Sequence, residues 1–363
     1  MGRSGQKAKY LYIEYLRVIC ALGVIVVHVS GANWYKIEMG SVDWIVQTFF
    51  NLAGRFSVCV FCMITGALLL RPGKNIGIRD LVFHYIKRIL ICYIAWVVLY
   101  AILYTILDHE NFSYFILRLF KQPDHLWYLL MLMGLYLIYP ILNIIAKNRD
   151  ITRYMILLLA AFGTLDTVSG VTGFFNEIVS ENYLYSLWKP FLGNLGTLNV
   201  AFVPGYVALF LLGHYINEYG LGFTHKIIVW SSIPALLLSG LLTVWISILT
   251  ERGVYTFMLE ANPLVFLASA GIFAFFRGDG SEVVKTEPVT SISKGMVRIA
   301  DNTFGIYLIH FAIREIMAKG FNFDVASYPA ILSVPINSLL IFAISLLLTV
   351  LLKKIPVVNK ILK

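Results

Sequence analysis

Charged residues are scarce in this chain, and their scarcity argues against a water-soluble fold. Asp, Glu, Lys and Arg make up 13% of the 363 residues, whereas a soluble domain averages about 25%. Hydrophobic residues reach 59%, and they form runs of about 20 residues, the length that a helix needs to cross a bilayer. The sequence therefore predicts an all-α integral membrane protein.

Cysteine is also rare, with four residues in the whole chain. All four lie within predicted spans, two of them in the "CVFC" of residues 59–62. This spacing occurs in redox motifs, but a helix in lipid is a poor place for thiol exchange, so we interpret them as small buried hydrophobes. A cleavable signal peptide is not expected, because the first apolar run is too long and lacks a small-residue cleavage site.

The apolar runs predict about ten transmembrane helices in a single domain, residues 1–363. Two longer connections separate them, an aromatic- and Gly-rich segment 169–199 and a polar, flexible segment 278–297. The predicted spans are residues 10–31, 42–70, 82–107, 125–146, 152–168, 200–217, 227–249, 259–277, 298–319 and 328–352.

The distribution of basic residues predicts the orientation of these spans. Of the 29 Lys and Arg residues, 20 lie in the termini and loops of one side and 6 in the loops of the other. By the positive-inside rule both termini are cytoplasmic, which makes 169–199 extracytoplasmic and 278–297 cytoplasmic. The net charge of +9 follows from this topology and from attraction to anionic lipid, so no nucleic-acid partner is expected.

Three ionisable residues interrupt the first span, Glu14, Arg17 and His28. Arg17 and His28 are 11 residues apart, close to three helical turns, so they share a face about 16 Å apart along the axis. Glu14 and Arg17, three residues apart, can pair on that face. A charge at mid-bilayer costs at least about 2.5 kcal/mol, so this face is expected to line a protein interior or a polar cavity.

Other spans carry polar groups at depth as well, which favours one shared cavity over a set of structural ion pairs. His310 and Arg314, four residues apart, lie on one face of the ninth span. The candidate cavity residues are Arg55, His125, Tyr136, His310 and Arg314. An imidazole in such a cavity can exchange a proton near neutral pH or accept an acyl group, which suits group transfer, and it equally suits a transport path.

A basic cluster stands at the cytoplasmic ends of the second and third spans. Its charges can bind the phosphates of coenzyme A, although topogenic charge alone explains them equally well. The cluster consists of Arg71, Lys74, Arg79, Lys87 and Arg88.

Several stretches resemble, in order, motifs of the acyltransferase-3 family of membrane O-acyltransferases. "YIEYLRVICALGVIVVHVS" is similar to the first helix of that family, with an acidic residue, Arg three later and His after ten more. The other matching stretches are "GRFSVCVFCMITGALLL", "FHYIKRILICYIAW", "HLWYLLMLMGLYLIYPIL", "ADNTFGIYLIH" and, more weakly, "FLLGHYI".

The resemblance implies a multi-pass enzyme of the bacterial cytoplasmic membrane that moves an acyl group, usually acetyl, from cytoplasmic acyl-CoA to a hydroxyl (or amine) of an envelope glycan or other small acceptor. It implies that His28 is the catalytic base or a transient acyl carrier, with Arg17 and Glu14 organising the donor side. Two departures stand out: Glu14 replaces the more common Asp, and "ILICY" lacks the usual proline of the third helix. No metal is predicted, and a homodimer is left open.

Two other functions compete with acyl transfer. The second-span motif with Arg55 resembles a branch that includes the enterobacterial common antigen O-acetyltransferase and the membrane halves of vancomycin-resistance serine racemases. The second setting suggests a serine transport or delivery module without acyl chemistry. A structural membrane anchor is disfavoured by the number of ionisable groups at depth.

Overall fold

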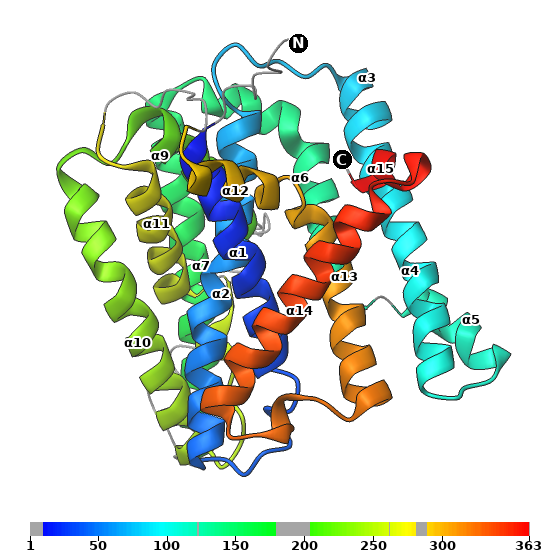
Figure 1. The fold of residues 1–363 in the computed structure, drawn as a ribbon. Coiled ribbons are helices and arrows are strands. Elements are labelled where there is room, and N and C mark those ends of the chain that lie inside the picture. The colour runs from blue at the N-terminus through cyan, green and yellow to red at the C-terminus, as the bar shows by residue number, and fades with distance from the viewer. Residues whose placement is uncertain (1–9, 122, 179–203, 261, 281–288, 363) are drawn as a thin grey trace.

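The computed structural model describes residues 10–121, 123–178, 204–260, 262–280 and 289–362. The regular secondary structure of these residues is helical, arranged as a bundle in which successive long helices run in alternating directions (Figure 1). The prediction of an all-α protein is confirmed for this part of the chain. The beginning of α1 (Leu11–Ser30) lies at the same end of the bundle as α15 (Pro356–Leu362) (Figure 1).

The remaining helices follow the predicted spans closely at most ends. A short π-helical segment, Leu81–Ile86, joins α3 to α4. The bounds are α2 Val42–Leu69, α3 Ile78–Asp80, α4 Lys87–Leu107, α5 Phe112–Phe120, α6 Trp127–Ala146, α7 Arg149–Ile178, α9 Pro204–Tyr219, α10 His225–Leu249, α11 Pro263–Arg277, α12 Ser291–Ala300, α13 Thr303–Glu315 and α14 Ala330–Leu352.

Seven helical segments of the described residues are long and apolar enough to cross a membrane. They correspond to the first four predicted spans, the seventh, the eighth and the tenth. The other three predicted spans correspond to α7, α9 and α13, which pack in the same bundle (Figure 1). α9 and α13 have only 16 and 13 residues, fewer than the about 20 that a bilayer requires, so the count of ten spans stays a prediction. The cytoplasmic side of the termini stays a prediction as well.

The structure corrects the predicted ninth span, 298–319, which is not one continuous helix. The chain breaks at Asp301 and Asn302, between α12 and α13. Thr290 caps α12 by accepting a hydrogen bond from the main-chain N–H of Ser293 at 3.1 Å, and α12 lies across the end of the bundle (Figure 1). The predicted flexible segment 278–297 is therefore helical from residue 291 onward.

The fifth span also extends further than predicted. α7 continues to Ile178, so the first part of segment 169–199 is helical rather than a connecting loop. The rest of that segment, residues 179–199, lies outside the described residues.

Glycine allows α2 and α9 to cross at backbone contact. A Cβ atom built at Gly66 would lie 1.8 Å from the main-chain oxygen of Phe210, and one at Gly213 would lie 2.0 Å from that of Met63. Small residues permit such close approach between helices in membranes. This crossing explains why the motifs "MITGALLL" and "FLLGHYI" each carry a glycine.

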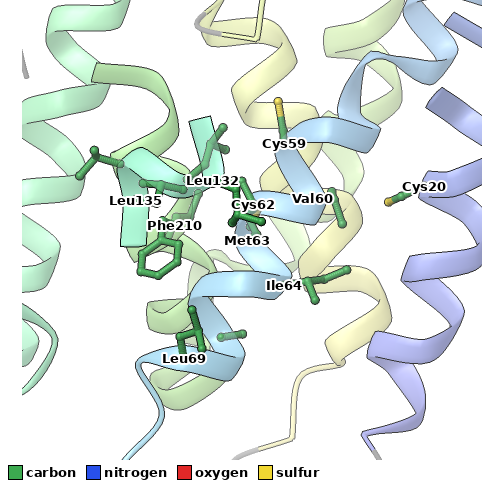
Figure 2. Close-up of a cluster of buried hydrophobic side chains, with 14 of the residues drawn as sticks. Cys20, Cys59, Val60, Cys62, Met63, Ile64, Leu69, Leu132, Leu135 and Phe210 are labelled. Atoms are coloured by element: carbon green, nitrogen blue, oxygen red, sulfur yellow. The ribbon is translucent and has the colours of Figure 1, made fainter. Parts of the chain in front are cut away.

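The core around this crossing joins α1, α2, α6 and α9. Figure 2 shows Leu132, Leu135 and Phe210 on one side of α2, while Cys20 of α1 approaches from the other. All four cysteines are buried free thiols, as expected for small hydrophobes. The Cys62 thiol donates a hydrogen bond to the main-chain oxygen of Tyr206 at 3.2 Å.

Candidate active site

The ion pair predicted in the first helix is present in α1. Nη1 of Arg17 lies 3.4 Å from Oε2 of Glu14, and the Glu14 side chain is buried whereas Arg17 is partly open. The α-helical spacing of three residues places both groups on one face. Glu14 thereby compensates a cation that faces into the protein.

Arg17 faces a cavity of about 390 Å³, which we call the basic cavity. Three basic side chains contribute to its wall, Arg17, Lys74 and Arg88, together with Tyr136. It lies at the end of the bundle where α1 begins. The rest of the wall is Val24, Val58, Phe61, Ile64, Thr65, Leu68, Leu69, Ile89, Tyr128, Leu132, Ala300, Asp301, Thr303, Phe304, Tyr307 and Leu362.

The predicted phosphate-binding cluster divides at this cavity. Lys74 and Arg88 line it, whereas Arg71, Arg79 and Lys87 are absent from its described wall. Lys74 is half-buried in the connection after α2, and this burial, with the nearby charge of Arg71, lowers the pKa of its ammonium group.

Three histidines from three helical regions meet at the other end of the same interior. The ring centroid of His28 lies 5.3 Å from that of His310 and 6.4 Å from that of His125, and the rings of His125 and His310 are 5.3 Å apart. His28 comes from the last turn of α1, His125 precedes α6, and His310 belongs to α13. The structure therefore brings together three of the residues that were expected to share a site, and their roles stay predictions.

His28 and His125 line a small cavity of about 70 Å³, which we call the histidine chamber. Arg55 lines it too, and its Nε donates a hydrogen bond to Oδ1 of Asn51 at 2.7 Å. Nη1 of Arg55 lies 3.7 Å from Oε1 of Glu260. The remaining wall residues are Glu260, Val24, Val27, Gly54, Val58, Trp127, Tyr128 and Tyr307.

Arg314 bonds to the main chain of His28 and lines neither of the two described cavities. Its Nη1 donates a hydrogen bond to the main-chain oxygen of His28 at 3.0 Å, and its side chain pairs with Glu315. The carbonyl of His28 is one of the last in α1, where a cation is favoured by the helix dipole. Arg314 also stacks on Phe311, 3.9 Å from the ring centroid.

The basic cavity and the histidine chamber share four wall residues, Val24, Val58, Tyr128 and Tyr307. Val24 lies on α1 between Arg17 and His28, so the face that carries the two polar residues borders both spaces. The hydroxyl of Tyr307 donates to the main-chain oxygen of His125 at 2.5 Å. A group bound beside Arg17 is therefore separated from the chamber at His28 only by these shared wall residues.

Sequence reasoning missed several residues of this interior. Tyr307 precedes His310 by three positions on α13, so helical spacing was a signal for Tyr307. Tyr128 lies in the first turn of α6, just after His125. Glu260 lies at the edge of the predicted eighth span. An ionisable residue inside an apolar span is a functional candidate, and this rule, which singled out Arg55, applies to Glu260 as well.

Several polar atoms of the histidine cluster are buried without a hydrogen-bond partner among the described residues. They are both ring nitrogens of His125 and Nε2 of His310, while Nδ1 of His310 lies 2.6 Å from the main-chain oxygen of Tyr307. Buried polar groups are normally satisfied, so these atoms are available to a substrate or to water. Within the described residues no group of three or more His, Cys, Asp or Glu side chains is arranged to hold a metal ion.

Together these features define a multi-pass helical membrane protein in which a basic cavity shares wall residues with a chamber lined by histidines. The chain belongs to the acyltransferase-3 family, because the family model described as an acyltransferase domain matches residues 10–353. The expected family membership is confirmed, and the protein is a membrane acyltransferase. A search of curated proteins and a search of solved structures returned no match, so the branch within the family stays a prediction.

Proposed function

We propose that this protein transfers a short acyl group, acetyl above all, from cytoplasmic acyl-CoA to a hydroxyl of an extracytoplasmic envelope acceptor, in a bacterial cytoplasmic membrane. The observation that carries the proposal is the common wall of the two cavities, formed by Val24, Val58, Tyr128 and Tyr307. It allows a donor and an acceptor to approach one histidine from opposite ends.

The donor side of the proposal rests on the basic cavity. Arg17, Lys74 and Arg88 present three cations, and phosphate groups form strong charge-assisted hydrogen bonds with such side chains. The phosphates of coenzyme A bind there, and the thioester extends along Val24 toward the histidine chamber. Arg71, Arg79 and Lys87 then serve topology, since positive charge on this side orients the spans.

His28 is the base of the reaction. Its imidazole takes the proton of the acceptor hydroxyl, the oxygen attacks the thioester carbonyl carbon, and a tetrahedral oxyanion forms. The C–S bond then breaks, and the coenzyme A thiolate leaves and takes up the proton. Arg55, held by Asn51 and Glu260, stabilises the oxyanion, because a fixed cation in a dry site is effective where charge develops.

The test uses purified protein in detergent with radiolabelled acetyl-CoA. Wild type is expected to release coenzyme A or to retain label, and His28→Ala is expected to lose this activity by at least a hundredfold. The matched control is His214→Ala, which removes another buried histidine whose Nε2 lies 3.1 Å from the main-chain oxygen of Ala146, away from both cavities.

Full activity in His28→Ala would overturn the assignment of the base. Wild type that neither binds acetyl-CoA nor releases coenzyme A would overturn the donor, and binding of serine under the same conditions would then indicate a delivery module.

A further inference from the structure

Tyr100 of α4 contacts the main chain of α13 through its hydroxyl group. The hydroxyl donates a hydrogen bond to the main-chain oxygen of Leu308 at 2.9 Å and accepts one from the main-chain N–H of Ala312 at 3.0 Å. Leu308 and Ala312 are four residues apart, so these are the two groups that pair with each other in a regular α-helix. Tyr100 therefore bridges the backbone ladder of a neighbouring helix.

His310 lies midway between the two bridged residues. A side chain that bonds to both groups of an i to i−4 pair ties that turn to its own helix, and here the turn is the one that carries His310. The ring of Tyr100 also packs against His125, with 4.9 Å between the ring centroids. One fully buried tyrosine thus contacts one histidine directly and holds the backbone of another.

We propose that Tyr100 is a positioning residue, which sets His310 and His125 against His28. The effect of Tyr100 on acyl transfer rests on the proposed function, whereas its effect on the position of His310 does not. Tyr100 lines neither the basic cavity nor the histidine chamber, so it acts through the two histidines rather than on the acyl donor.

The test is Tyr100→Phe, which keeps the ring and removes only the bridging oxygen. The turn between Leu308 and Ala312 then loses both hydrogen bonds to α4, and His310 moves with that turn. We expect kcat for acetyl transfer to fall by about tenfold or more, since small displacements at a reacting centre are costly. The KM for acetyl-CoA is expected to stay within about twofold, because the basic cavity is untouched.

The matched control is Tyr104→Phe, one turn further along α4. The Arg118 guanidinium and the Lys319 ammonium form cation–π contacts with the Tyr104 ring, 4.9 Å and 5.3 Å from its centroid. Phenylalanine preserves both contacts. This variant is expected to keep the wild-type kcat. Unchanged kcat in Tyr100→Phe, or equal losses in both variants, would overturn the positioning role.

A second readout does not depend on catalysis. In protein labelled with 15N-histidine, the ring resonances of the buried His310 are expected to shift in Tyr100→Phe, while those of the exposed His84 stay as in wild type. Unchanged His310 resonances would refute the geometry. If wild type transferred no acyl group, the proposed function would fall, and the His310 resonances would still decide whether Tyr100 positions this histidine.

Discussion

Replacing Glu315 by Gln should destabilise the fold far more than replacing an exposed acid of the same kind. The Glu315 carboxylate pairs with Arg314 and lies 3.3 Å from the ammonium of Lys319. Glu315 is only 8% exposed. Gln keeps the volume of the side chain, so the effect reports on lost charge rather than on a cavity.

The expected size follows from the burial of each partner. Removing one member of a buried ion pair costs about 3–5 kcal/mol, because the other charge is left uncompensated. The Lys319 side chain is 38% exposed, so its pair adds at most about 1 kcal/mol. Since Arg314 keeps its bond to the His28 main chain, we expect a total near the lower limit, about 3 kcal/mol.

The assay is denaturant unfolding in detergent micelles, with Asp80→Asn as the matched control. Asp80 pairs with His84, and their side chains are 66% and 74% exposed, so this variant should unfold like wild type. A loss of stability in Glu315→Gln no larger than in Asp80→Asn would refute the reasoning from burial.

Three further outcomes are expected. Gly213→Ala should destabilise the protein by about 1–3 kcal/mol through overpacking against Met63. Gly134→Ala should not, because no atom lies within 4 Å of its added Cβ. The melting temperatures of the two variants in detergent test this difference. The KM for acyl-CoA should begin to rise with pH below the range in which an exposed lysine loses its proton, because burial lowers the pKa of Lys74 and the neutral amine binds phosphate poorly. Lys74→Arg should flatten this profile. Trp127→Ala enlarges the histidine chamber of about 70 Å³. It should raise kcat/KM for butanoyl-CoA relative to acetyl-CoA about tenfold, as measured with the two donors in competition. An unchanged ratio would show that the chamber does not hold the acyl group.

Much of the site could be predicted because its residues follow the helical repeat. The pairing of Glu14 with Arg17 depends only on spacing within α1, and the structure has it at 3.4 Å. His310 and Arg314 do share one face of α13, yet the structure gives them different roles. His310 joins the histidine cluster, while Arg314 bonds the main chain of α1.

Other parts of the site depend on partners that are distant in sequence. Glu260 reaches Arg55 from the segment before α11, and Tyr100 reaches Leu308 and Ala312 across 208 and 212 positions. No local pattern marks such pairs, because they arise from how helices pack. The break before α13 was missed for a related reason: α12 continues the helical pattern up to Ala300, and the turn at Asp301 and Asn302 carries no Gly or Pro that would mark it.

The sequence by itself determined the membrane class, the position of most helices and the family, since each depends on the length of apolar runs, on helical spacing or on short ordered motifs. Only the tertiary structure decided which of the basic residues line a cavity, that the basic cavity and the histidine chamber share a wall, and that Arg314 and Tyr100 act on backbone. Those properties depend on the close packing of helices, which Gly66 and Gly213 permit at the α2–α9 crossing, and packing of this kind is set by the whole bundle at once.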